Sequence, residues 1–148
     1  MNEELRELYQ ETILDHYRRP RNFGKLAKPT HHSEGHNPFC GDQVTVMLIV
    51  KDDHIADVKF EGVGCAISTA SASMMTEAVL GKTVEEADAI MTRFRDAIME
   101  GKSVEGLGSL EALTGVREHP VRIKCATLAW HTLRAALHEE GNVLAGAD

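Results

Sequence analysis

The apolar pattern of the chain changes its period near residues 62–65, and this change restricts the fold more than any other feature. Before it, residues 43–50 are almost continuously apolar and β-branched, and residues 55–61 alternate between apolar and charged side chains. After it, from Ile67 to Ala78, the side chains of one stripe recur at three- and four-residue steps, the spacing of a helix. The sequence therefore predicts a hairpin with one face packed and one partly wet, followed directly by a helix.

Helical patterns also flank the predicted hairpin. Residues 4–18 carry apolar side chains at helical spacing, and a capping box, Thr83-x-x-Glu86, begins another helix. Pro120 suits the first turn of a last helix, which we expect to run to Gly141. A helix, then strands, then helices is the order of an α+β domain. We expect a small antiparallel sheet with the helices packed on one of its faces.

The remaining segments have weaker patterns. Residues 19–43 are rich in Pro, Asn, Gly and His, which predicts an irregular stretch that could include one short edge strand. Residues 101–118 predict a loop with one short helix, and we expect the tail after Gly141 to be frayed. A length of 148 residues without repeats or linkers is that of one domain, so we expect a single domain over residues 1–148.

The charge of the chain argues against two classes of partner. It has 16 Lys and Arg against 23 Asp and Glu, a formal net charge of -7, whereas nucleic-acid binding requires a basic surface. An anionic membrane surface is disfavoured for the same reason, and no apolar run approaches the ~18 residues of a transmembrane helix. Residues 1–7 are charged and show no apolar signal-peptide core. We therefore expect a cytoplasmic protein with reduced thiols.

Three cysteines are the residues best suited to carry chemistry. Cys40 lies in a turn sequence before a strand, and the Gly between Cys40 and Asp42 would let both side chains point at one ion. Cys65 lies between a glycine pair and a helix start, and Cys125 lies in the first turns of the last helix. Helix N-termini and nearby cations stabilise thiolates. Because an odd number of widely spaced cysteines is a poor disulfide framework, we consider core filler, nucleophile and metal ligand as their roles.

Zinc prefers four ligands of the S, N or O type, and the chain offers such a set: Cys40, Asp42, Cys65 and Cys125. Three thiolates and one carboxylate leave about -2 at a Zn²⁺ site, which Arg122 and Lys124 could offset. Plainer alternatives stay open at this point. A free cysteine is most often a buried small hydrophobe. For Cys125, this structural role and a functional role are about equally supported by the sequence. Asp42 alone suits a turn, and the two cations suit a solvated helix face.

Three sequence blocks, each with one cysteine, resemble the IscU/NifU-like iron–sulfur cluster assembly family, and its SufU branch in particular. They read NPxCGD at 37–42, GxGCxISxASASMM at 62–75 and RxKCAxLxW at 122–130. A further block contains DHY and PRN within residues 15–22. The resemblance covers about residues 5–140 and is specific, because the three cysteine blocks occur in the family's order. It implies an IscU/SufE-like α+β fold.

Two departures separate the chain from the IscU branch. IscU scaffolds carry a His directly before the third cysteine, where this sequence has Lys124. They also carry a Leu-Pro-Pro-Val-Lys chaperone motif, where residues 119–124 read HPVRIK. Residues 101–119 look like the insertion that is typical of SufU proteins. We therefore do not expect binding to an Hsc-type chaperone.

The resemblance to SufU implies a zinc-dependent sulfur acceptor that takes persulfide sulfur from a SufS-type cysteine desulfurase. It implies four zinc ligands: Cys40, Asp42, Cys65 and Cys125. It also implies that Cys40 is the catalytic residue, which accepts the sulfur after the docked desulfurase displaces it from zinc. Such a protein is a sulfurtransferase-type accessory protein rather than a stand-alone enzyme, and Suf scaffold proteins are candidate further partners.

Two alternatives use the same four residues. An IscU-type scaffold would assemble a [2Fe–2S] cluster on them, and soft thiolates bind zinc and iron–sulfur clusters alike. The absence of the His before Cys125 favours zinc. A structural zinc domain without sulfur transfer would also fit a closed four-ligand site.

Overall fold

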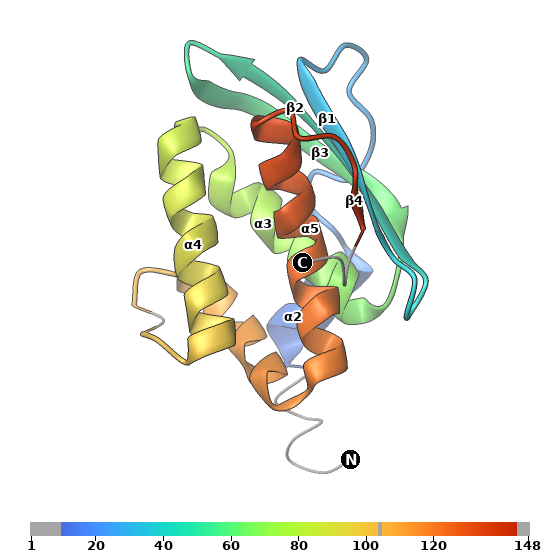
Figure 1. The fold of residues 1–148 in the computed structure, drawn as a ribbon, viewed down its shortest axis with the longest axis vertical. Helices are drawn as coiled ribbons and strands as arrows, with labels where there is room; N and C mark the ends of the chain where they lie inside the picture. Colours follow the sequence, from blue (N-terminus) through green and yellow to red (C-terminus); the bar gives the residue numbers. More distant parts are fainter. Residues whose placement is uncertain (1–9, 104, 145–148) are drawn as a thin grey trace.

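The computed structural model describes residues 10–103 and 105–144. Its elements, in chain order, are α2 (Glu11–Arg18), β1 (His31–Asn37), β2 (Asp42–Lys51), β3 (His54–Val63), α3 (Ala66–Val79), α4 (Val84–Glu100), the 3₁₀ helix η1 (Gly108–Glu118), α5 (Pro120–Leu137) and β4 (Val143–Leu144). The strands form one sheet in the order β3-β2-β1-β4. β2 is antiparallel to both of its neighbours, and β4 is parallel to β1. Figure 1 shows the helices packed on one side of this sheet, which confirms the predicted α+β architecture.

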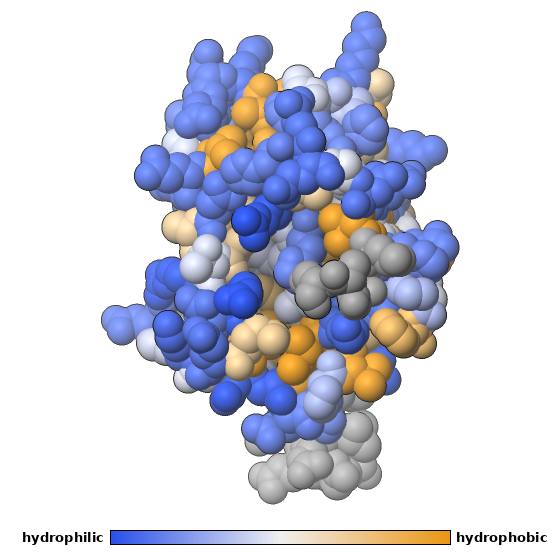
Figure 2. Space-filling view, in the orientation of Figure 1, coloured by the Kyte–Doolittle hydropathy of each residue, from blue (hydrophilic) through white to orange (hydrophobic). Residues whose placement is uncertain are grey.

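The hairpin β2–β3 is the apolar part of the sheet, close to where the sequence predicts it. Its turn, Asp52-Asp53, has positive φ angles of 51° and 64°, the backbone form of a two-residue hairpin turn. The inward side chains are buried and pack against α3 and α5: Val44, Val46, Leu48, Ile55, Val58 and Phe60. The face in Figure 2 is mostly hydrophilic with small apolar patches, as expected when the apolar side chains are inside.

β1 differs most from the sequence-based expectation of an irregular stretch with a short edge strand. It has seven residues and lies inside the sheet, between β2 and β4. Its buried side is made of Ser33, Gly35 and Asn37 rather than apolar residues. A Cβ atom on Gly35 would lie 2.0 Å from Oγ1 of Thr132, so α5 approaches this strand as closely as a glycine allows. Hydropathy does not reveal the strand, because its burial depends on α5.

Buried hydroxyl groups connect α3 to the helices on either side of it. Ser71 accepts a hydrogen bond of 3.0 Å from Nε1 of Trp130 on α5. Ser73 accepts one of 2.8 Å from the backbone N–H of Arg21, and its Oγ lies 2.7 Å from Nδ1 of His16 on α2. These bonds satisfy polar groups that would otherwise be costly to bury. They place α3 at the centre of the helical layer.

The ends of the helices agree with the sequence signals at several points. Thr83 and Glu86 form both hydrogen bonds of the predicted capping box at the start of α4. Pro120 begins α5, which ends at Leu137 rather than near Gly141.

The last described residues of the chain pair with the sheet. Residues 143–144 form β4 beside β1, whereas the sequence predicts a frayed tail. Residues 145–148 and the predicted helical residues 4–9 lie outside the described residues. Within the described residues, no helix has the length and apolarity that crossing a membrane requires.

Candidate metal centre

Four separate elements bring the candidate ligands to one end of the molecule. Cys40 lies in the turn of residues 38–41 between β1 and β2, and Asp42 is the first residue of β2. Cys65 is the N-cap residue of α3, and Cys125 lies in the second turn of α5. The β1–β2 turn, the β3–α3 junction and the start of α5 come together in the lower part of Figure 1.

Cys40, Asp42 and Cys125 form a compact group. Their ligand atoms all lie within 4.8 Å of one another. The Cys40 thiol donates to Oδ2 of Asp42 at 2.9 Å, and its Sγ lies 3.5 Å from Sγ of Cys125. Asp42 and Cys125 are fully buried, whereas Cys40 is exposed. The group therefore combines one accessible thiol, that of Cys40, with a buried carboxylate and a buried thiol.

Cys65 adjoins this group without belonging to it. Its backbone N–H donates to Oδ1 of Asp42 at 3.0 Å, and its Sγ accepts from the N–H of Ser68 at 3.4 Å. Its thiol is outside the 4.8 Å group. The structure therefore gathers three of the four predicted ligands, and the role of all four as ligands stays a prediction.

Gly64, directly before Cys65, leaves room for the carboxylate of Asp42. A Cβ atom on Gly64 would lie 2.8 Å from Oδ1 of Asp42. Only a glycine therefore lets the carboxylate reach the N–H of Cys65. The same carboxylate then spans both sides of the site, since its other oxygen accepts from Cys40.

The three thiols differ in how readily they ionise. Burial raises the pKa of Cys40, and its hydrogen bond to Asp42 raises it further. The Cys125 thiol lowers the pKa of Cys65 to about 6, against an opposing effect of burial. The pKa of Cys125 is raised, first by its interaction with Cys65 and then by burial. Cys65, at the N-terminus of α3, is therefore the thiol that ionises most easily.

Asn37 is a site residue that sequence reasoning did not single out. Its Oδ1 accepts from the N–H of Phe39 at 3.1 Å, and its backbone carbonyl accepts from the N–H of Gly41 at 2.8 Å. These bonds shape the turn that carries Cys40. Asn37 is fully buried, and its Nδ2 has no hydrogen-bond partner among the described residues. An Asn at the start of a turn is the sequence signal that could have identified it.

The predicted supporting cations lie at the start of α5. Nζ of Lys124 lies 5.5 Å from the centroid of the Phe39 ring, a cation–π distance. Lys124 thus contacts the Cys40 turn through the neighbouring aromatic ring. Arg122 is half-buried one turn before Ala126, on the same helix. That both residues offset ligand charge stays a prediction.

Exposed apolar side chains accompany each cysteine. Phe39, Val63 and Val121 have exposed fractions of 73%, 67% and 62%. Phe39 precedes Cys40, and the carbonyl of Val121 lies 3.7 Å from Sγ of Cys125. Hydropathy alone could not separate these residues from core positions. They are the three most exposed large apolar side chains among the described residues.

The donor set fits a thiophilic metal. Thiolates with one carboxylate suit zinc or iron–sulfur clusters, whereas calcium and magnesium prefer oxygen ligands alone. Asp42 is fully buried, and a buried carboxylate requires charge compensation. A divalent cation between Asp42 and the thiolates would supply it.

Comparisons with known proteins agree on one family. The family profile described as "NifU-like N terminal domain" matches residues 8–140. The zinc-dependent sulfurtransferase SufU of Bacillus subtilis (strain 168) is 44% identical over 94% of this chain and 95% of its own length. The iron–sulfur cluster assembly scaffold protein IscU of Streptococcus pyogenes serotype M1 is 41% identical over 93% of this chain and 87% of its own length.

Solved structures share the fold. A protein of Fervidobacterium islandicum AW-1, described as an iron–sulfur cluster assembly scaffold for the SUF system, superposes with a TM-score of 0.83 at 40% identity, covering 89% of this chain and 98% of its own. The N-terminal part of a NifU-like protein from Brucella abortus gives a TM-score of 0.86 at 25% identity, covering 92% and 96%.

Proposed function

Because this chain belongs to the NifU-like N terminal domain family, we propose that it works in iron–sulfur cluster assembly as a zinc-binding sulfur acceptor. Cys40 is the accepting residue. The observation that carries this proposal is the difference in exposure among the cysteines, since Cys40 is exposed, Cys65 is intermediate and Cys125 is buried. A persulfide on another protein has to reach the thiol that attacks it, and only an exposed thiol allows this approach.

We assign the zinc to four residues: Cys40, Asp42, Cys65 and Cys125. The 4.8 Å group of Cys40, Asp42 and Cys125 supports this assignment, and Asp42 links it to Cys65 through the 3.0 Å hydrogen bond. Bound zinc keeps cysteine ligands as thiolates, the nucleophilic form. The zinc dependence named for the Bacillus subtilis relative supports the same metal.

The proposed donor is a SufS-type cysteine desulfurase. The Cys40 thiolate attacks the terminal sulfur of the enzyme's persulfide, and a new S–S bond forms on Cys40. The enzyme's own S–S bond breaks, and its electron pair leaves on the enzyme's cysteine as a thiolate. Lys124 and Arg122 at the start of α5 would stabilise the negative charge on the transferred sulfur.

The surface around Cys40 suits such a partner. Phe39, Val63 and Val121 present apolar side chains beside a thiol that must meet a second protein. We place the reaction in the cytoplasm, where thiols stay reduced. A Suf scaffold protein would then receive the sulfur held on Cys40.

A second candidate function is assembly of a [2Fe–2S] cluster on the same residues. Relatives named as scaffolds favour it, since their identity to the chain is close to that of the sulfurtransferase. Thiolate ligands do not discriminate between the two cargoes. In this case the cluster would be the product that the site builds.

The test begins with protein purified without oxygen. Metal analysis should find about one zinc per chain, and the absorption spectrum should lack the visible bands of an iron–sulfur cluster. Addition of the protein to a SufS-type desulfurase with cysteine should raise turnover severalfold and leave a persulfide on Cys40, mapped by peptide mass. A coloured, iron-containing protein would establish the scaffold function instead, and zinc without any stimulation would indicate a structural site.

A further inference from the structure

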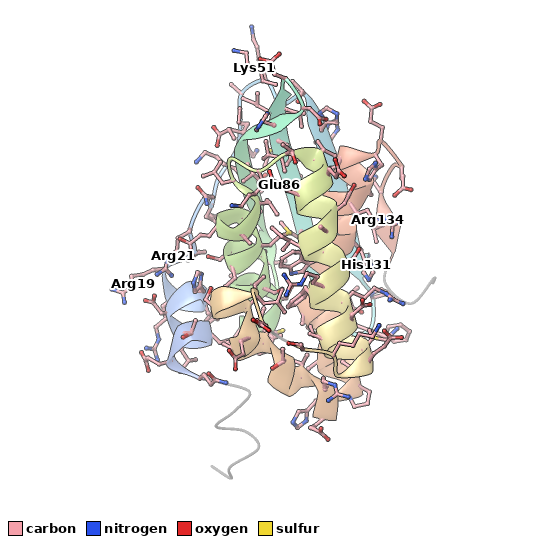
Figure 3. The ribbon with its side chains drawn as sticks, turned by 90° about the vertical axis from the view of Figure 1, so that its left-hand side faces the viewer. Arg19, Arg21, Lys51, Glu86, His131 and Arg134 are labelled. Carbon is pink, nitrogen blue, oxygen red and sulfur yellow. The ribbon has the colours of Figure 1, made fainter. Side chains whose placement is uncertain are left out.

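A groove of about 370 Å³ runs between α4 and α5 and shares no residue with the candidate metal centre. Its lining comes from both helices: Asp88, Met91, Thr92, Phe94, Arg95, Thr127, Trp130, His131, Arg134 and His138. Its volume is within the range of about 300–1,000 Å³ that small-molecule sites occupy. Figure 3 shows His131 and Arg134 on α5 at the border with α4.

The floor of the groove is apolar and aromatic. The rings of Phe94 and Trp130 stack with their centroids 4.5 Å apart and an angle of 23° between their planes. Met91 lies in the same floor, and all three residues are buried. Such a floor favours a flat hydrophobic body over a fully polar ligand.

The walls of the groove carry positive charge. Arg95 comes from α4 and Arg134 from α5. The side chain of Arg134 forms no hydrogen bond or ion pair within residues 10–103 and 105–144, and Nη1 of Arg95 donates to Oδ1 of Asp96, its neighbour on α4, at 3.4 Å. The lining includes one carboxylate, that of Asp88, and Nε2 of His138 lies 3.0 Å from both of its oxygens. The walls therefore offer the guanidinium group of Arg134, that of Arg95 with one of its donors directed at Asp96, and an acidic group that already has a partner.

We propose that this groove binds a small organic anion that combines a flat apolar body with a carboxylate or phosphate head. Guanidinium groups match the geometry of these two heads and form charge-assisted hydrogen bonds to them. The hydroxyl groups of Thr92 and Thr127 lie in the same lining and supply further polar contacts.

The experiment uses the single tryptophan of the chain as its probe. Because Trp130 lies in the floor, its fluorescence reports directly on the occupied groove. The purified protein is titrated with phenyl phosphate, and in parallel with inorganic phosphate and with phenol. We expect a saturable change with phenyl phosphate and at least about tenfold weaker binding of the other two, since each has only half of the required chemistry.

Variants on the two helices locate the binding. Arg134→Gln and Arg95→Gln should each raise the Kd for phenyl phosphate by about tenfold or more, because each removes a charge-assisted contact. Arg93→Gln on α4 is the matched control, since Arg93 does not line the groove. It should leave the Kd unchanged, as should Cys40→Ala at the metal centre. Circular dichroism checks that all variants remain folded.

Three results would overturn the proposal. They are the absence of a saturable response to phenyl phosphate, equal binding of phenol, and an unchanged Kd in both Arg134→Gln and Arg95→Gln. None of these results depends on zinc or on the desulfurase. The groove and the proposed sulfur transfer can therefore succeed or fail separately.

Discussion

The two sides of the candidate metal centre are built differently. On the loop side, Cys40 is exposed and lies in a turn that two hydrogen bonds to Asn37 shape. On the helix side, Cys65 caps α3, and Cys125 is fully buried in α5. Turns open at lower free energy than packed helices. In the proposed sulfur transfer, the helix side would supply the stable part of the site and the loop side the thiol that reacts.

The largest expected effect follows removal of the thiol on the loop side. Cys40→Ala should abolish the stimulation of a SufS-type desulfurase, because no exposed thiol is left among the three cysteines. The protein should remain folded, with the free energy of unfolding lowered by about 1–3 kcal/mol, because the fully buried Asp42 loses the hydrogen bond that the Cys40 thiol donates. Desulfurase turnover and urea denaturation measure the two quantities. A Cys40→Ala protein that still accelerates the enzyme and collects sulfur on Cys125 would move the acceptor to the helix side.

The second prediction concerns Gly64, which lets one carboxylate serve both sides. Gly64→Ala places a methyl group where only 2.8 Å separates it from Oδ1 of Asp42, so the carboxylate must shift. We expect metal affinity to fall by about 10–100-fold, as for other changes that misplace a ligand. Competition with a chromophoric chelator measures it. Val63→Ala, at an exposed neighbouring residue, is the control that should keep the affinity.

The third prediction concerns the support of the helix side. Ser71→Ala leaves the buried indole N–H of Trp130 without its acceptor, which should lower the free energy of unfolding by about 1–3 kcal/mol. Ser109→Ala, at an exposed position, should have no measurable effect. Metal content and sulfur transfer should persist in both variants below the unfolding transition. An unchanged urea midpoint in Ser71→Ala would show that this bond does not stabilise the helix layer.

The fourth prediction is a smaller effect remote from both sides. Thr83→Ala removes the side-chain cap that accepts from the N–H of Glu86 at the start of α4. The expected loss is about 1 kcal/mol of unfolding free energy. Thr83→Ser retains the hydroxyl and should restore most of it. A change in metal affinity or in sulfur transfer in Thr83→Ala would contradict the expectation that both sides of the metal centre are independent of α4.

The smallest effect should appear as a pH dependence of stability at α2. Burial, and then the charge of Arg21, lower the pKa of His16 from its usual 6.5, against the opposing effect of Glu77. Protonation is then harder in the folded protein than in the unfolded chain. His16 therefore contributes its full stability above about pH 6.5, and the contribution is lost as the pH falls through the lowered pKa. Between pH 7 and 5, the free energy of unfolding measured by urea denaturation should depend less on pH in His16→Gln than in the wild type.

The structure bears out several local sequence signals because those signals are complete within a few residues. The capping box of Thr83 and Glu86 contains both partners of its hydrogen bonds. The turn at 51–54 and the alternation after it specify a hairpin without reference to the rest of the chain. The order of helices and strands follows from the same local periods and leads to the α+β class.

The candidate site shows where local reasoning is insufficient. The three cysteine blocks indicate the candidate ligands, and the structure brings the ligand atoms of Cys40, Asp42 and Cys125 within 4.8 Å of one another. The offset of Cys65 from that group depends on how α3 begins beside Asp42, the first residue of β2. The exposed fractions of Phe39, Val63 and Val121 depend on which elements cover the site, and their hydropathy is the same in a core as on a surface.

The sequence alone therefore determined the class of fold, the local helix and turn signals and the identity of the candidate ligands. The tertiary structure decided the position of β1, the pairing of β4 and the groove between α4 and α5. The physical reason is that periodicity reports only the burial of apolar side chains. Ser33, Gly35 and Asn37 are buried because α5, about a hundred residues later in the chain, packs closely enough to cover small and polar groups. Such close contacts exist only after the chain has folded, and no local pattern encodes them.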